Sequence, residues 1–275
     1  MVANLYPPPR PLSVGETIDL AFRIFRATLV TCLVLAGLAV IAGQLPNIYL
    51  LLTGHPLVSI LQQRDPRYWL LDVAGNLLLM MLISAIVLRQ YAVVAAAGAA
   101  VGTELGTIAR RLPALVLLWI LYVAAIAIWF LPAYLLRASP VTALLLALLM
   151  SLPATYVAIA VSCCWQVFLL SGRGAVRSIA YSWRLTRGHW WRLSAIYTVG
   201  AMLLVVLYVL AGVLALAIAL PLSRDLATTT AASTVIVVVL SAIGTPFYTA
   251  LALAVYGDLT ARREGADLAQ RIAAA

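Results

Sequence analysis

The residues best suited to chemistry in this sequence are arginines and tryptophans gathered in one short segment. They are Arg177, Arg184, Arg187, Trp190 and Trp191. A guanidinium binds phosphate through paired hydrogen bonds, and an indole carries a polar N–H on an apolar body that suits the boundary between lipid and water. This combination predicts contact with anionic lipid headgroups or with a protein partner at a membrane surface.

A second group of polar side chains lies within or beside long apolar stretches. These residues are Asn76, Arg89, Gln90 and Gln166. Such groups either form hydrogen bonds between neighbouring helices or line a cavity for a polar headgroup or solute, and both interpretations stay open. Arg89 lies at the inner edge of the bilayer or within it, and within the bilayer it would be functional by default.

Catalytic chemistry is not expected. An enzyme needs an acid, a base or a nucleophile that converge on one point. The sequence has no paired carboxylates in its apolar stretches and no glycine loop that could cradle phosphate. It has two histidines, on opposite sides of the predicted membrane, and three cysteines within apolar stretches. We therefore expect no catalytic residue, no cofactor and no metal site.

Composition places the chain in a membrane. Its 275 residues are 65% hydrophobic and 10% charged, whereas a soluble domain has about 45–50% and about 25%. Six apolar stretches are long enough for a helix to cross a bilayer, which takes about 20 residues. They run over 29–52, 70–88, 112–136, 141–170, 193–220 and 235–256. The expected fold is all-α, a polytopic bundle of six transmembrane helices.

The arginines predict the orientation of the chain. All 18 basic residues are arginines, and the formal net charge is +9. Six crossings place both termini on one side, and that side holds every arginine except Arg64, Arg67, Arg137 and Arg224. Because cytoplasmic loops are enriched in basic residues, we expect both termini in the cytoplasm. The positive charge then borders anionic lipid and does not call for nucleic acid as a partner.

The six crossings group into three hairpins, each preceded on the cytoplasmic side by a short amphipathic segment. These segments run over 14–26, 102–111 and 175–187. Ser13 and Glu16 have the spacing of a capping box at the start of the first. In the third, Val176, Ile179, Ala180 and Trp183 share one helical face. Helices of this kind lie in the headgroup plane or against their neighbours.

We expect one membrane domain over 1–275, with a flexible N-terminus over 1–12 and a cytoplasmic tail over 258–275. Asp258, at the start of that tail, is expected to be a solvated carboxylate near the membrane edge. Gly98, Gly102 and Gly106 are spaced by four residues. They would therefore line one helical face and allow another helix to approach closely.

Three parts of the sequence carry a family resemblance. They contain PLSVGETID (11–19) with FRIFR (22–26), then SIAYSWRLTRGHWWR (178–192), and finally YGDL (256–259) with RREGADL (262–268). With these motifs the chain resembles a bacterial six-span family that includes the membrane domain attached to some glycerophosphoryl diester phosphodiesterases. The family's hydrolase is a separate soluble barrel, so the resemblance implies a stand-alone membrane component without phosphodiesterase activity.

Two functions follow as expectations. The first is an accessory or scaffold protein of the bacterial inner membrane, without catalytic activity, whose arginine-rich cytoplasmic helices contact anionic lipid and could also bind a protein partner. The absence of lysine and the abundance of alanine favour a bacterial source with a GC-rich genome. The alternative is a transporter or channel for a small polar solute or lipid headgroup, with Asn76, Gln90 and Gln166 lining its path.

Overall fold

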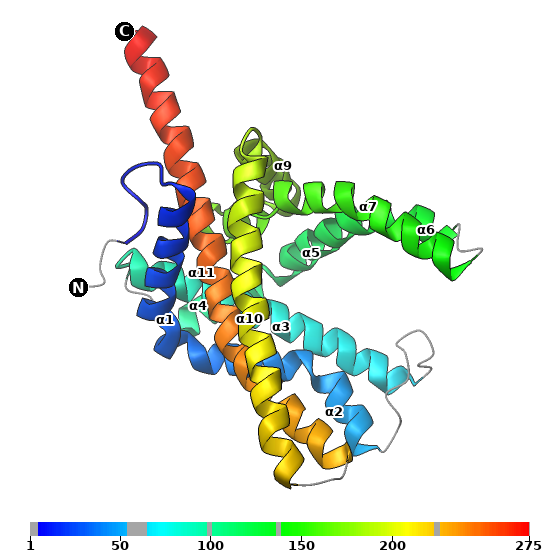
Figure 1. Cartoon of the computed structure of the whole chain (residues 1–275). Coiled ribbons are helices and arrows are strands. Elements are labelled where there is room, and N and C mark those ends of the chain that lie inside the picture. The colour runs from blue at the N-terminus through cyan, green and yellow to red at the C-terminus, as the bar shows by residue number, and fades with distance from the viewer. Residues whose placement is uncertain (1–4, 54–64, 98–100, 136–138, 223–225, 275) are drawn as a thin grey trace. The chain divides into compact units, whose positions relative to one another are not determined.

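A computed structural model of the chain describes residues 5–53, 65–97, 101–135, 139–222 and 226–274 (Figure 1). The described residues are almost entirely helical and contain no strand, which confirms the expected all-α class. Six of their helical segments are long and apolar enough to cross a membrane. They are Val14–Gly43, Pro66–Val94, Leu112–Leu135, Val141–Ser171, Trp190–Leu214 and Val238–Arg263.

The described residues form helices along most of their length. In chain order they are α1 (Val14–Gly43), α2 (Leu45–Leu52), α3 (Pro66–Val94), α4 (Val101–Arg110), α5 (Leu112–Ala127), the 3₁₀ turn η2 (Ile128–Phe130), α6 (Leu131–Leu135), α7 (Pro140–Ala160), α8 (Cys164–Ser171), α9 (Ala175–Thr186), α10 (Trp190–Leu222) and α11 (Leu226–Ala274).

Local sequence explains several helix starts. The predicted capping box at α1 is present, because the Ser13 amide donates to the Glu16 carboxylate at 2.7 Å and the Glu16 amide donates to the Ser13 hydroxyl at 3.3 Å. Asp65 caps α3 by accepting from the Arg67 amide at 2.9 Å, and a proline follows Asp65 at the first helical position. Proline suits that position because its missing N–H has no helical partner there.

The first crossing differs from the predicted range. The amphipathic segment 14–26 and the apolar residues after it form one continuous helix, α1, because no glycine or proline separates them. The helix then ends at Gly43, and α2 begins at Leu45, immediately before Pro46. The predicted crossing over 29–52 is therefore divided between two helices, and the first candidate span begins at Val14 instead.

The described chain divides into two compact units. The first contains Phe22–Ala109 and Val199–Ala250, and the second contains Leu5–Ala21, Arg110–Thr198 and Leu251–Ala275. Each unit gathers segments that are distant in sequence, and the chain passes from one unit to the other within α1, at the end of α4, within α10 and within α11. The sequence therefore has no single boundary that would split it into two consecutive domains.

The first unit packs through small residues. Ile24, Thr28 and Cys32 recur every four residues along α1 and are fully buried, so they form one stripe on the helix. Gly75 of α3 lies so close to α1 that an added Cβ would be 2.4 Å from the Ala42 carbonyl oxygen. On the outward faces large apolar side chains are exposed, including Val30 at 84%. Exposed apolar faces of this extent suit contact with lipid.

The second unit places α9 against α5, α7 and α8, while α7 also contacts α6 and η2. Two glycines with left-handed backbone conformations delimit α9. Gly172, with a φ of +68°, ends α8, and Gly188, with a φ of +87°, lies in the turn between α9 and α10. Residues other than glycine rarely adopt this backbone conformation, so these two turns depend on glycine.

Replacing Gly75 by alanine should destabilise the protein. The new Cβ would collide with backbone, and overpacking of this kind costs about 1–3 kcal/mol. Gly106→Ala is the control, because an added Cβ there meets no atom within 4 Å and alanine favours helix by up to about 1 kcal/mol. Thermal unfolding in detergent should show a lower midpoint for Gly75→Ala only. Equal midpoints for the two variants would contradict the close approach of α3 to α1.

Candidate functional site

The arginine segment folds as α9 and the start of α10, and its charged side chains are exposed. Arg177, Arg184 and Arg187 all lie on the surface of the second unit. Val176 is 64% exposed and Trp183 is 39% exposed, so the apolar face predicted from their spacing points outward beside the arginines. One exposed face of α9 thus carries both positive charge and apolar surface.

The opposite face of α9 is buried and rich in hydroxyl groups. Ser178, Ser182, Leu185 and Thr186 are all buried there. The Ser182 and Thr186 hydroxyls donate to the Ala160 carbonyl at the end of α7, at 3.2 Å and 2.8 Å. These bonds satisfy polar groups that would otherwise be costly to bury. They also determine which side of the helix remains outside.

Cationic groups surround Tyr181 on α9. The guanidinium carbon of Arg173 lies 3.6 Å from the centre of the tyrosine ring, and those of Arg263 and Arg184 lie at 5.1 Å and 5.9 Å. A guanidinium over an aromatic face is favourable, so the ring helps to hold these like charges together. Arg173, Arg177 and Arg184 line a surface hollow of about 340 Å³.

The exposed arginines of this segment lack counter-charges among the described side chains. Within the part of the chain whose side chains are described, no ion pair joins Arg177, Arg184 or Arg187 to a carboxylate. An uncompensated cluster of this kind raises the local positive potential. The surface is therefore available to an anion from outside the chain.

The tryptophans lie beside a second hollow. The Trp190 ring contacts Trp191 with centroids 4.7 Å apart and Tyr156 with centroids 5.7 Å apart. Trp191 itself is 81% exposed. The hollow has a volume of about 320 Å³, and its lining comes from α7, α9, the turn after α9 and the start of α10. It is lined by Tyr156, Ala160, Trp183, Thr186, Arg187, Gly188 and Trp190.

A buried carboxylate lies next to this segment and was not anticipated. Asp258 was expected to be solvated, but it is only 1% exposed. Its carboxylate pairs with Arg192 of α10 and with Arg262 of α11, the latter at 3.1 Å. It also accepts from the Leu12 amide at 2.7 Å. The expectation was wrong because a position near a membrane edge does not show whether arginines from elsewhere in the chain enclose the carboxylate.

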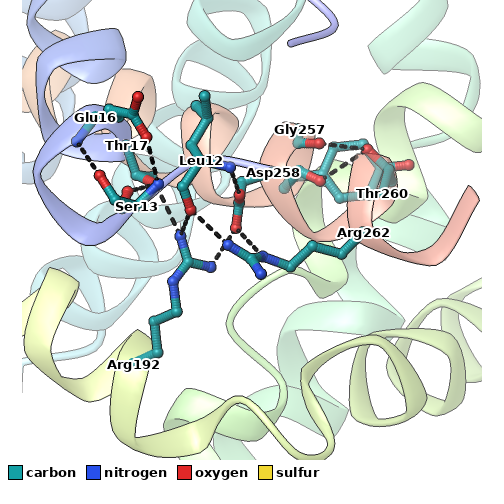
Figure 2. A network of polar contacts seen from close by, with 10 residues as sticks. Leu12, Ser13, Glu16, Thr17, Arg192, Gly257, Asp258, Thr260 and Arg262 are labelled. Carbon is teal, nitrogen blue, oxygen red and sulfur yellow. Dashed lines mark hydrogen bonds and ion pairs between the residues drawn. The ribbon is translucent and has the colours of Figure 1, made fainter. Parts of the chain in front are cut away.

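Figure 2 shows how these groups converge. Arg192 also donates to the Leu12 carbonyl and, at 3.2 Å, to the Thr17 hydroxyl, and Arg262 donates to the same carbonyl. We call Leu12, Thr17, Arg192, Asp258 and Arg262 the Asp258 cluster. It joins the segment before α1 and the start of α1 to the start of α10 and to the interior of α11. Leu12 and Asp258, which are in direct contact, are separated by 246 positions in the sequence.

The Asp258 cluster includes a residue of the segment 1–12, which was predicted to be flexible. Residues 1–4 lie outside the described residues. Leu12 is held on both its amide and its carbonyl, and Tyr6 is only 8% exposed. An added Cβ at Gly257 would lie 2.6 Å from the Tyr6 ring.

The spacing of Asp258 and Arg262 was the one signal for this cluster in the sequence, since i and i+4 share a helical face.

The four residues of the predicted polar cavity have different surroundings. The Gln90 amide is fully buried and donates to the Pro246 carbonyl of α11 at 2.8 Å, which is a hydrogen bond between helices. Asn76 is exposed and donates to the Asp72 carbonyl of its own helix at 2.8 Å. Gln166 belongs to the other unit, where its Oε1 has no hydrogen-bond partner among the described residues.

Arg89 forms an ion pair that the sequence did not indicate. Its guanidinium lies 3.6 Å from the Glu104 carboxylate, whose side chain is only 4% exposed. Burial raises the pKa of Glu104 above its usual 4.5, and the charge of Arg89 acts in the opposite direction. Glu104 turns inward with Ile108 on the buried side of α4, so this side of α4 combines an ion pair with apolar contact.

Glycines of α4 do not have the predicted packing role within the chain. An added Cβ at Gly102 or Gly106 would meet no atom within 4 Å. Gly98 lies outside the described residues. The close approach that the spacing suggested occurs at Gly75 of α3, where no motif marks it.

The six apolar helices and their exposed apolar faces define a multi-pass integral membrane protein. Comparisons of the chain with protein families, curated proteins and solved structures found no match. Within the described residues, no group of three or more histidine, cysteine, aspartate or glutamate side chains could hold a metal ion. The exposed face of α9 and the adjoining hollows are therefore the candidate site.

Replacing Asp258 by asparagine should destabilise the protein strongly. Removing one partner of a buried ion pair costs about 3–5 kcal/mol, and we expect the lower end because Arg192 and Arg262 keep side-chain exposures of 17% and 27%. Arg10→Gln is the control, because it breaks the Arg10–Glu16 pair, whose side chains are 68% and 41% exposed, at a cost below about 1 kcal/mol. Unfolding in mixed micelles measures both. A small effect of Asp258→Asn would contradict the structural role of the cluster.

The pKa of Glu104 predicts a pH dependence. Because burial raises this pKa above 4.5 in the folded protein, the proton is bound more tightly when the chain is folded. The resulting stability is fully present below the unfolded pKa and is lost as pH rises through the folded pKa. The stability of the wild type relative to Glu104→Gln should thus fall as pH rises above about 4.5. A difference that stays constant with pH would show that Glu104 is not shifted.

Proposed function

We propose that this protein is a non-catalytic accessory or scaffold protein of the bacterial inner membrane, with both termini in the cytoplasm. In this proposal α9 lies in the headgroup region of the cytoplasmic leaflet and contacts anionic lipid. The single observation that carries it is the exposed face of α9, where arginines without counter-charges lie beside exposed apolar side chains. The distribution of arginines along the sequence supports the orientation.

The physical fit is that of an interfacial helix. Val176 and Trp183 would enter the boundary between headgroups and acyl chains, while Arg177, Arg184 and Arg187 would reach phosphates. Each basic residue near an anionic leaflet contributes about 1 kcal/mol, so three of them together would contribute about 3 kcal/mol. In water the same apolar side chains would be exposed at a cost.

A scaffold role also accommodates a protein partner. The same arginines could pair with carboxylates of a partner at the membrane surface, where rim charges set the rate and register of association. The resemblance to the six-span family belongs to this proposal, because it implies a stand-alone membrane component without phosphodiesterase activity. No nucleic acid, cofactor or metal enters the proposal.

The transporter alternative is less favoured. It required Asn76, Gln90 and Gln166 to line one path. The hydrogen bond from Gln90 to the Pro246 carbonyl supports a role in joining helices instead, and the exposed Asn76 amide is engaged by its own helix. The Gln90 contact is the ordinary use of an amide between transmembrane helices.

Reversing the charge of Arg177, Arg184 and Arg187 to glutamate should remove anionic lipid from the vicinity of the protein. Lipid co-extracted with the wild type in polymer-bounded membrane discs should be enriched in anionic species over the bulk membrane, and in the triple variant it should match the bulk. Lysine at the same three positions is the control and should retain the enrichment, because it keeps the charge. Equal enrichment in the wild type and the glutamate variant, with insertion intact in both, would refute lipid contact through α9.

A further inference from the structure

Two residues that line the hollow beside Trp190 carry hydrogen-bond donors without a partner among the described residues. The Trp190 Nε1 atom is buried, and it has no hydrogen-bond partner among the described residues. Arg187 lines the same hollow and, in the described part of the chain, forms no ion pair. A buried donor without an acceptor is costly. A ligand that brings acceptor oxygens into the hollow would relieve this cost.

The lining of the hollow carries positive charge and no carboxylate. Arg187 supplies the charge, and no aspartate or glutamate is among the lining residues. The Ala160 carbonyl is already engaged, because it accepts from the hydroxyls of Ser182 and Thr186. A phosphate ester matches this chemistry, because its charged oxygens accept strong hydrogen bonds from guanidinium and indole N–H groups.

The walls of the hollow are aromatic and open to the surface. Tyr156 contacts the Trp183 ring with centroids 6.0 Å apart and the Trp190 ring with centroids 5.7 Å apart. Tyr156 and Trp183 are 46% and 39% exposed. Tyrosine and tryptophan in this position suit the level of the headgroups. The ligand is thus expected to have an apolar part next to its phosphate.

The turn after α9 determines how the two donors are presented. Gly188, with a φ of +87°, lies between Arg187 and the start of α10. The His189 amide donates to the Thr186 carbonyl at 3.0 Å and closes the turn. Arg187 and Trp190 therefore face one hollow from the two ends of the same tight turn.

We propose that this hollow binds the phosphate ester of one phospholipid headgroup, with Arg187 and the Trp190 indole N–H as donors and with Tyr156 and Trp183 beside the glycerol portion. This inference rests on the proposed function, since it requires α9 at the level of the headgroups. It adds a single defined site to the general attraction of the arginine face. A soluble phosphate ester has the same recognition chemistry, and the exposed aromatic walls favour the lipid.

The test is native mass spectrometry of the full-length, delipidated protein in detergent. Phosphatidylglycerol is titrated, and monogalactosyl diacylglycerol, which lacks phosphate, is titrated in parallel. We expect one phosphatidylglycerol molecule to bind in preference to the galactolipid. Trp190→Phe and Arg187→Gln should each weaken its binding about tenfold, the loss expected for one hydrogen bond to a charged group. Trp191→Phe is the matched control and should bind like the wild type, whereas Arg177→Gln, at a residue outside the lining of the hollow, should weaken binding less than Arg187→Gln does.

The other outcomes would refute either the binding site or a phospholipid as its ligand. Equal binding of the galactolipid, or unchanged binding by both Trp190→Phe and Arg187→Gln, would overturn it. Equal weakening by Arg187→Gln and Arg177→Gln would show a general electrostatic attraction of lipid to the arginines. That result would refute the defined site in the hollow but not the proposed function. Displacement of the lipid by sn-glycerol 3-phosphate would overturn the lipid as occupant. Arg187 is exposed, so its variant tests the site even if Trp190→Phe does not fold.

Discussion

The interaction on which the second unit depends most is the burial of the Asp258 carboxylate between Arg192 and Arg262 (Figure 2). A buried charge is tolerated only when partners replace its lost hydration. Here the partners come from two helices and from the Leu12 amide, so the beginning of α10, the interior of α11 and the segment before α1 must meet. Because Arg192 lies two residues after Trp190, the same contact also places the turn that carries Arg187.

If α9 lies in the headgroup region as proposed, its two faces reverse the usual relation between polarity and burial. The face directed into the protein carries serine and threonine hydroxyls, which the Ala160 carbonyl accepts. The face directed outward carries Val176 and Trp183 together with arginines. In a water-soluble protein the apolar side chains would face the interior and the hydroxyl groups would face the solvent. At a lipid interface it is favourable, because the lipid supplies both apolar contact and negative charge.

Several features were predictable because they depend on local chemistry. Composition and length identified six helices able to cross a membrane, and the spacing of Ser13 and Glu16 identified a capping box that is present. The segment containing Arg177 and Arg184 was predicted as an amphipathic helix, and α9 covers nearly the predicted range. Boundaries were less predictable, as α1 shows, because a helix continues until a breaker such as Pro46 intervenes, whatever its amphipathic pattern.

The sequence by itself determined the helical class, the membrane environment and the segment that carries positive charge, because apolar length and charge distribution act without knowledge of which residues meet. Only the tertiary structure decided the partners. Asp258 forms an ion pair with Arg192, and Arg89 forms one with Glu104. The close approach of helices occurs at Gly75 and not at Gly102 or Gly106. Each of these contacts depends on which faces of distant helices pack together. No local pattern specifies that choice, so it depends on the packing of the chain as a whole.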